Sequence, residues 1–167
     1  ARNIAPGLNR KFACEQWERI GQQIWKEARI AAYKAIQYDV TPEIYGSDID
    51  SQAIALAEEN AVKAGVDDCI QFEVKSSRHV KLPGKYGVMI TNPPYGERIG
   101  ELKEVEQLYR ALGELMKEDT TWSSYVITSM EYFESLFGRK ADKKRKLFNG
   151  RIKTDYYQFE GPRPPKV

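Results

Sequence analysis

The stretch that decides the fold is "EIYGSDIDSQAIALAEENAVKAGVDDCIQFEV", residues 43–74. Both of its ends are short strand-like runs, and the middle predicts a helix over residues 51–65. Asp50 or Ser51 is suited to the N-cap of that helix, and Gly65 follows its last turn. Because a helix that joins two strands brings them side by side in the same direction, this stretch predicts a parallel sheet.

The rest of the chain continues the alternation and then departs from it. Asn149-Gly150 lies between two strand-like runs within residues 144–160, and this dipeptide favours a tight hairpin with positive φ at both turn residues. We therefore predict an α/β fold, with a mostly parallel sheet that ends in an antiparallel hairpin. The predicted strands are residues 70–74, 86–91 and 123–129, together with residues 43–50, a short strand that runs into a polar turn. The predicted helices are residues 14–36, 51–65, 102–118 and 130–138.

The composition fits one globular domain with its own core. The chain has 167 residues, of which 41% are hydrophobic and 30% charged. Cys14 and Cys69 have no metal-type spacing and His79 is the single histidine, so we expect no metal site and reduced thiols. No apolar run approaches the roughly 18 residues of a membrane span, and no long apolar segment occurs at the start. We therefore expect a cytoplasmic protein that does not bind a membrane.

Positive charge is concentrated near the end of the chain. The formal net charge is only +2, but "RKADKKRK", residues 139–146, holds six positive charges and one negative. Such a run is either a solvated loop or an edge that contacts phosphates, and the run alone favours the solvated loop.

Polar residues follow two of the predicted strands, at Asp48 and Asn92. Ligands of parallel α/β sheets bind at the carboxyl ends of the strands, so both residues are expected at one edge. An acidic residue there can accept hydrogen bonds from the two hydroxyls of a ribose. The alternative for Asp48 is a turn or cap residue, but Asp50 competes for the cap, and the two interpretations stay balanced.

The polar corner Asn92-Pro93-Pro94-Tyr95 interrupts an apolar strand. The Asn92 amide oxygen and the Pro93 carbonyl oxygen are two successive acceptors, and the prolines fix the backbone that holds them. Tyr95 adds a flat face on which a base could stack. This arrangement suits a planar compound with an exocyclic amine, and we favour it over a loop with an incidental aromatic.

The run "NPPYGERIG", residues 92–100, resembles the signature of S-adenosylmethionine-dependent methyltransferases that act on exocyclic or amide nitrogens. Together with "ARNIAPGLNRKFACEQW" (1–17), "GSDID" (46–50) and "DKKRKLFNGRIKTDYYQF" (142–159), it is similar to the THUMP-associated guanine-N2 methyltransferases of large-subunit ribosomal RNA. The resemblance covers almost the whole chain. The bare four-residue signature is shared with adenine-N6 DNA methylases and protein glutamine methylases.

The resemblance implies a Rossmann-like class I methyltransferase domain over residues 1–160, followed by a flexible tail at 161–167, with S-adenosylmethionine as cofactor and ribosomal RNA as partner. Asp48 would hold the cofactor ribose and Ile49 would pack on its adenine. Ser76 stands where many relatives have an aspartate that reads the adenine, which weakens its assignment. The residues implied for the target amine are Asn92, Pro93, Pro94 and Tyr95, with Asn92 also near the cofactor. The residues implied for RNA phosphates are Arg98, Lys143, Lys144, Arg145 and Lys146, although Arg98 could equally pair with Glu97 or Glu101.

One departure from the family concerns its glycine-rich loop on the first strand, which has no counterpart among the 12 glycines. The family's upstream RNA-binding module also has no counterpart. We therefore expect this chain to be the carboxy-terminal part of a longer enzyme and to be inactive alone. An upstream portion or a second copy would complete its sheet. The alternatives are an adenine-N6 DNA methylase, a protein glutamine methylase, or an RNA-binding module without chemistry.

Overall fold

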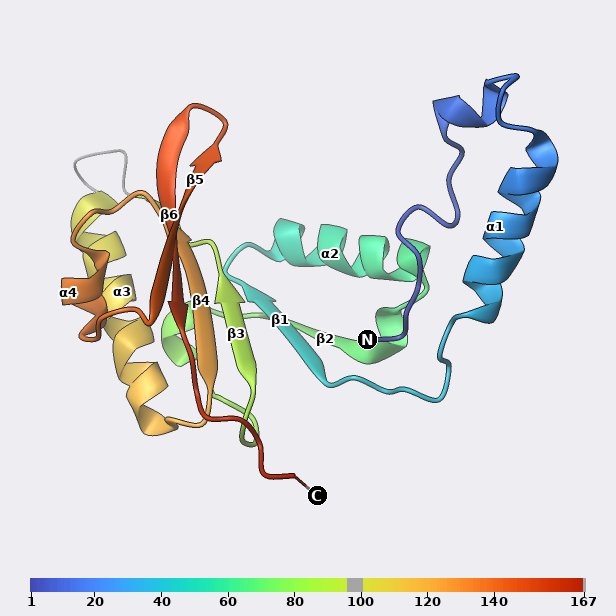
Figure 1. Cartoon of the computed structure of the whole chain (residues 1–167). Helices are drawn as coiled ribbons and strands as arrows, with labels where there is room; N and C mark the ends of the chain where they lie inside the picture. The colour runs from blue at the N-terminus through green and yellow to red at the C-terminus, as the bar shows by residue number, and fades with distance from the viewer. Residues whose placement is uncertain (96–100, 167) are drawn as a thin grey trace. The chain divides into compact units, whose positions relative to one another are not determined.

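The strand–helix–strand unit predicted from residues 43–74 is present as β1 (Ile44–Asp48), α2 (Ser51–Ala64) and β2 (Ile70–Val74) (Figure 1). The computed structural model describes residues 1–95 and 101–166, in two compact units, Ala1–Lys75 and Ser76–Val167. The single domain expected over residues 1–160 stays a prediction.

The first unit is built on the two parallel strands. Their register runs from Ile44 opposite Ile70 to Asp48 opposite Val74. The Asp50 carboxylate accepts a hydrogen bond from the backbone N–H of Gln52 (2.8 Å), which confirms Asp50 as the N-cap of α2. The remaining elements of this unit are the 3₁₀ turns η1 (Ala13–Gln16) and η2 (Asp67–Cys69) and the helix α1 (Gln22–Lys34).

The continuous helix predicted over residues 14–36 is wrong in its first part. The chain forms only the short turn η1 and then starts α1 after Gly21, whose backbone is extended (ψ 142°). A glycine is costly inside a helix and common at its boundary, so the break falls there. The apolar side chains expected on one helix face are not all covered, since Trp17 is 63% exposed.

The second unit contains a four-stranded mixed sheet in the order β3-β4-β6-β5. β3 and β4 are parallel, whereas β6 pairs antiparallel with both β4 and β5. Of the four strand pairs in the described residues, two are therefore antiparallel, a larger share than the sequence predicts. The elements of this unit are η3 (Ser77–His79), β3 (Val88–Thr91), α3 (Glu101–Glu118), β4 (Ser123–Thr128), α4 (Phe133–Phe137), β5 (Lys143–Asn149) and β6 (Ile152–Phe159).

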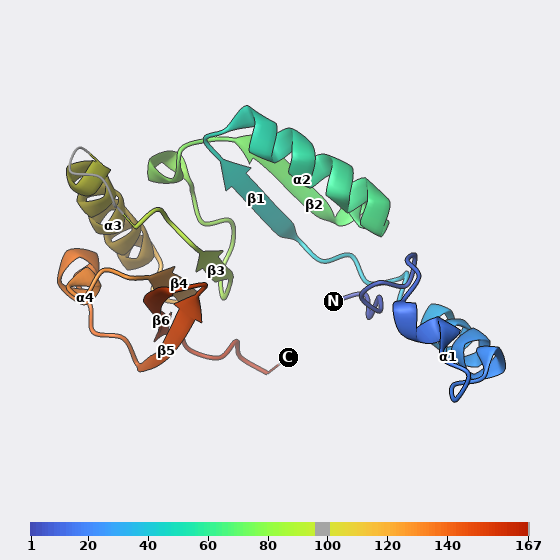
Figure 2. The same ribbon diagram turned by 90° about the horizontal axis from the view of Figure 1, so that it is seen from above.

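The core of the second unit lies between this sheet and the helices α3 and α4, which cover the same face (Figure 2). Buried side chains from all three layers meet there, with Phe133 of α4 packed edge-on against Tyr109 of α3. The helices approach closely at Gly113, where a Cβ atom would lie 2.1 Å from the Phe137 carbonyl oxygen. The core cluster comprises Val105, Tyr109, Leu112, Val126, Met130, Phe133, Leu136, Phe137, Tyr157 and Phe159.

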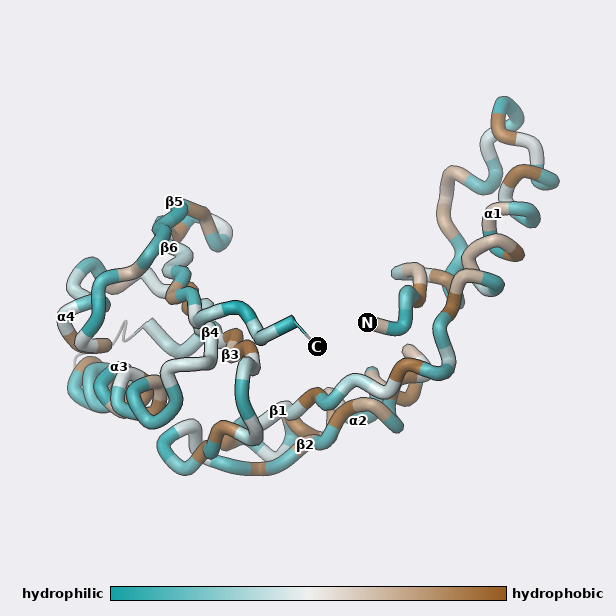
Figure 3. Tube along the Cα trace, turned by 60° about the horizontal axis from the view of Figure 1, so that its bottom comes forward, coloured by the Kyte–Doolittle hydropathy of each residue, from teal (hydrophilic) through white to brown (hydrophobic). Residues whose placement is uncertain are grey.

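The opposite face of this sheet is apolar and exposed at β3. Val88 is 57% exposed and Ile90 is 74% exposed, and the tube is brown, hydrophobic, at this strand (Figure 3). Among the described residues, β3 pairs only with β4 and β1 pairs only with β2, so each strand has one free edge. The expectation that another segment or a second copy completes the sheet stays a prediction.

The C-terminal hairpin is present, but its turn differs from the expected one. Asn149 is still part of β5, and the two turn residues are Gly150 and Arg151. Only Gly150 has positive φ (61°), the pattern of a type II′ turn. Two other predicted elements are shortened by local geometry. β3 begins at Val88, after Tyr86 with φ 60°, and α4 ends before Gly138 with φ 76°.

The helices of the described residues include none that is long and apolar enough to cross a membrane.

Candidate functional site

The corner Asn92-Pro93-Pro94-Tyr95 lies at the carboxyl end of β3, directly after Thr91. Proline lacks the N–H that a strand needs and fixes its own φ, so the sheet ladder stops here. Asn92 is exposed, Pro93 is buried, and Tyr95 is half-buried. The corner is therefore anchored by a proline and presents polar groups to solvent.

Tyr95 and Asn92 are linked by a hydrogen bond. The Tyr95 hydroxyl donates to the Asn92 amide oxygen over 2.9 Å. This oxygen was predicted to accept a hydrogen from the target amine. A carbonyl-type oxygen has two lone pairs, so the bond from Tyr95 leaves one for a further donor. The phenol thus orients the amide and does not block it.

A buried network holds the corner from behind. The Tyr109 hydroxyl of α3 donates to the Pro94 carbonyl oxygen (3.0 Å) and lies 2.7 Å from the Thr128 hydroxyl at the end of β4. Tyr109 has one hydroxyl hydrogen, so Thr128 must donate to Tyr109, and it accepts in turn from the Met130 backbone N–H (3.1 Å). Tyr109 and Thr128 are both fully buried. Burial raises the pKa of Tyr109 above its usual value, so the hydroxyl stays protonated as a donor.

Tyr109 and Thr128 are not among the site residues predicted from the sequence. A signal was available, because Tyr109 interrupts the apolar stripe of α3 between Val105 and Leu112. A tyrosine in a buried position usually finds a partner for its hydroxyl. The identity of that partner depends on how α3 packs on the sheet.

The β5–β6 hairpin meets the corner at its tip. The Asn149 side-chain nitrogen lies 3.5 Å from the Tyr95 hydroxyl oxygen, at the outer limit of a hydrogen bond. The basic run at 139–146, for which a solvated loop was the favoured interpretation, belongs to strand β5 from Lys143 onward. The structure therefore brings part of the predicted RNA-binding run into the same unit as the predicted amine site.

The four basic residues at 143–146 differ in their surroundings. Lys143 pairs with Glu160 (3.0 Å), and Lys144 pairs with Asp155 (3.1 Å). These partners raise the pKa of both lysines, in Lys144 first through a hydrogen bond with Tyr157. Arg145 and Lys146 are exposed, and no acidic partner is found for them among the described residues. Arg98, the fifth residue predicted to bind RNA, lies outside the described residues.

The residues predicted to hold the cofactor are divided between the units. Asp48 ends β1, and one of its carboxylate oxygens accepts from the Asp50 backbone N–H (2.9 Å). Its other oxygen has no partner among the described residues, and the side chain is exposed. Ile49 beside it is 76% exposed. Ser76 belongs to the second unit, where its hydroxyl accepts from the Arg78 backbone N–H (3.4 Å). The roles predicted for these three residues stay predictions.

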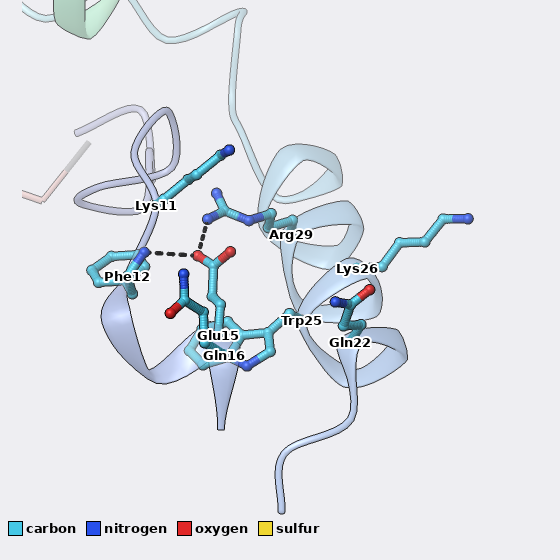
Figure 4. Close-up of a pocket in the computed structure, with 8 residues that line it drawn as sticks. All are labelled: Lys11, Phe12, Glu15, Gln16, Gln22, Trp25, Lys26 and Arg29. Carbon is cyan, nitrogen blue, oxygen red and sulfur yellow. Dashed lines mark hydrogen bonds and ion pairs between the residues drawn. The ribbon is translucent and has the colours of Figure 1, made fainter. Parts of the chain in front are cut away.

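A separate hollow of about 450 Å³ lies in the first unit, between η1 and α1 (Figure 4). The Arg29 guanidinium crosses it to Glu15 and to the Arg10 carbonyl oxygen (2.7 Å). A backbone hydrogen bond from Phe12 and the Arg29 charge lower the Glu15 pKa. None of the predicted site residues lines this hollow, whose residues are Lys11, Phe12, Glu15, Gln16, Gln22, Trp25, Lys26 and Arg29.

Residues 1–158 match the family model described as UPF0020: RMKL-like, methyltransferase domain. The chain belongs to this family. Its members are methyltransferase domains, which agrees with the resemblance carried by the corner at residues 92–95.

Two curated relatives share much of the sequence. The chain is 50% identical over 157 residues to "Putative RNA methyltransferase YpsC" of Bacillus subtilis (strain 168), covering 94% of this chain and 41% of the relative. It is 40% identical over 162 residues to "Ribosomal RNA large subunit methyltransferase K/L" of Shewanella sediminis, covering 92% of this chain and 22% of the relative. The chain thus spans less than half the length of either relative.

Solved structures confirm the Rossmann-like α/β methyltransferase fold. The structure of SMU.472 complexed with SAH has a TM-score of 0.91 at 41% identity, covering 98% of this chain and 44% of that chain. "A predicted N6-adenine-specific DNA methylase from Listeria monocytogenes str. 4b F2365" has a TM-score of 0.88 at 45% identity, covering 96% of this chain and 41% of that chain.

Proposed function

We propose that the protein transfers the methyl group of S-adenosylmethionine to the exocyclic N2 amine of a guanine in large-subunit ribosomal RNA. The observation that carries this proposal is the corner at the end of β3, where the exposed Asn92 amide is oriented by Tyr95 and the Pro94 carbonyl is held by buried Tyr109. The names of the Bacillus and Shewanella relatives support RNA as the substrate class.

The side chains at the predicted cofactor positions have the chemistry needed to bind S-adenosylmethionine. An exposed carboxylate with one open oxygen at Asp48 suits the two hydroxyls of a ribose, and Ile49 next to it offers a largely exposed apolar surface for a purine ring. For Ser76 the proposed role is a hydrogen bond from its hydroxyl to the cofactor. The SMU.472 structure, which holds SAH, supports S-adenosylmethionine as the cofactor. When bound, S-adenosylmethionine supplies an electrophilic methyl group.

The corner would act on the amine of the target base. The lone pair of guanine N2 is delocalised into the ring, which makes it a poor nucleophile. If Asn92 and the Pro93 carbonyl accept both amine hydrogens, the lone pair becomes localised on nitrogen. Tyr95 would lie against the face of the base, and the proton would leave the nitrogen after the transfer. Catalysis of this kind depends on positioning and on fixed dipoles more than on a strong base.

RNA would be held beside the corner by the basic strand β5. Arg145 and Lys146 are free to contact phosphates, whereas Lys143 and Lys144 would first have to leave their acidic partners. Arg98 follows the corner in sequence and is proposed to assist. A base in folded RNA must also leave its stack to reach the corner.

Labelled methyl transfer tests the proposal. The full-length gene product is incubated with tritiated S-adenosylmethionine and, in parallel, with unmodified large-subunit ribosomal RNA, duplex DNA and a release factor. We expect label in the RNA, and nucleoside analysis should identify N2-methylguanosine. Label only in DNA, the substrate suggested by the name of the Listeria protein, or only in protein would overturn the proposal. Failure of the same gene product to bind S-adenosylmethionine in a calorimetric titration would favour an RNA-binding module without chemistry.

A further inference from the structure

The tip of the β5–β6 hairpin projects beyond the rest of its sheet (Figure 1). β6 pairs with β4 only from Asp155 to Phe159. Beyond Asp155, three more residue pairs join β6 to β5 alone: Leu147–Thr154, Phe148–Lys153 and Asn149–Ile152. No third strand pairs with this end of the hairpin in the described part of the chain, so it is a two-stranded ribbon.

Phe148 on this ribbon is 69% exposed. A tight turn needs no aromatic at this position, since the Gly150 backbone already accounts for the turn geometry. The phenyl ring is largely exposed and close to a candidate active site, so it is available to a partner. A flat apolar ring is suited to stacking on another flat ring.

The ribbon tip is tied to the corner that is proposed to hold the target amine. Asn149, the neighbour of Phe148, lies 3.5 Å from the Tyr95 hydroxyl, which in turn donates to Asn92. Successive side chains of a strand point to opposite faces, so Phe148 shares its face of the ribbon with Lys146 and with its cross-strand partner Lys153, and Asn149 lies on the other face. The Asn149–Tyr95 contact places the ribbon tip beside the corner, so a base stacked on Phe148 would belong to a neighbouring nucleotide.

The positive charge of the ribbon indicates which class of molecule supplies the flat ring that stacks on Phe148. Four cations on the hairpin are exposed and have no acidic partner among the described residues: Arg145, Lys146, Arg151 and Lys153. The only acidic side chain within either strand, Asp155, is engaged by Lys144. Cations that track a phosphate backbone, with an aromatic on which a base stacks, form the usual platform for single-stranded nucleic acid.

We propose that Phe148 is a substrate-positioning residue that stacks on the nucleotide next to the target guanine in an unpaired segment of the RNA. Lys146 and Lys153, on the same face of the ribbon as Phe148, hold the flanking phosphates, and the Asn149–Tyr95 contact keeps the ribbon tip beside the corner. This inference rests on the proposed RNA methyltransferase function.

The test compares variants at position 148 in the full-length gene product, with steady-state methyl transfer to unmodified large-subunit ribosomal RNA as the readout. Phe148→Leu keeps an apolar side chain of similar size but lacks the ring, whereas Phe148→Trp keeps a flat ring. Ile152→Ala is the matched control, because Ile152 is also on the ribbon, is 39% exposed and has no ring.

We expect Phe148→Leu to lower kcat/KM for RNA by about tenfold, in line with the loss of one base–aromatic stack, and Phe148→Trp to stay within about twofold of the wild type. Ile152→Ala should also stay within about twofold. The Kd for S-adenosylmethionine should be the same in all four proteins, which shows that the variants remain folded.

Equal kcat/KM for Phe148→Leu, Ile152→Ala and the wild type would overturn the stacking role. So would an equal loss in Phe148→Leu and Phe148→Trp, since that would indicate packing of one particular side chain. A wild-type protein that methylates no RNA would instead overturn the proposed function on which this inference rests.

Discussion

Removal of the Tyr109 hydroxyl by Tyr109→Phe should loosen both the core and the corner. The substitution deletes two hydrogen bonds, one to the Pro94 carbonyl oxygen (3.0 Å) and one from Thr128 (2.7 Å). Thr128 is fully buried, so its hydroxyl hydrogen would lose its partner with no water to replace it, at a cost of about 1 kcal/mol or more. Pro94 is exposed, so water could partly replace the bond there, and that loss should be about 0.5–1 kcal/mol. Together they lower the free energy of local opening by about 2 kcal/mol.

Native-state hydrogen exchange measures this quantity in the full-length gene product. A loss of about 2 kcal/mol corresponds to amide exchange about 30-fold faster in β4, Ser123–Thr128. Tyr125→Phe is the matched control, because Tyr125 is half-buried and its hydroxyl has no hydrogen-bond partner among the described residues. That control should change the free energy by less than about 0.5 kcal/mol.

A double-mutant cycle tests the Tyr109–Thr128 hydrogen bond directly. Thr128→Val removes the same Tyr109–Thr128 hydrogen bond from the other side, so the combined variant should be about 1 kcal/mol more stable than the sum of the single effects predicts. Strictly additive effects, or exchange in Tyr109→Phe that matches the Tyr125→Phe control, would refute the network as described. Since Tyr109 also holds the corner, kcat/KM for methyl transfer should fall about tenfold in Tyr109→Phe.

Four other outcomes are expected. Asn92→Ala should lower kcat by about 100-fold or more while RNA binding, measured by filter retention, stays within about twofold, because the lost acceptor acts on the reacting amine; retained kcat would exclude that role. Asp48→Asn should weaken S-adenosylmethionine binding about tenfold in calorimetry, since the amide can keep the turn hydrogen bond to Asp50 but loses the charge; unchanged affinity would remove Asp48 from the cofactor site. Gly150→Ala should cost about 1–2 kcal/mol of hairpin stability, seen as faster exchange in β5 and β6, because φ is 61° and only conformational strain opposes the new Cβ; unchanged exchange would contradict the turn assignment. Burial raises the pKa of Tyr109, so above about pH 10 the unfolded state loses the hydroxyl proton while the folded state keeps it. The free energy of unfolding, measured in urea titrations, should therefore fall as pH rises, and it should fall less steeply in Tyr109→Phe. The same pH dependence in both proteins would contradict this prediction.

Local signals predicted much of the fold. The β1–α2–β2 unit, the Asp50 cap and the hairpin near Asn149 each depend on residues within a few positions of one another, such as a capping carboxylate or a glycine with positive φ. The errors arose where two local signals competed. The apolar spacing of residues 14–36 favoured one helix, but Gly21 divides it.

The candidate site likewise has one part that the local sequence predicts and another that depends on tertiary packing. Because a proline pair, an amide and an aromatic are adjacent in the chain, the sequence by itself determined that a rigid polar corner stands at residues 92–95. Only the tertiary structure decided what supports that corner and what lies beside it. Tyr109 reaches Pro94 because α3 packs its apolar stripe on the sheet, and Asn149 reaches Tyr95 because β6 pairs antiparallel with β4 and carries the hairpin tip there. Contacts between residues 15 and 54 positions apart depend on how whole elements pack, and no short stretch of sequence encodes that arrangement.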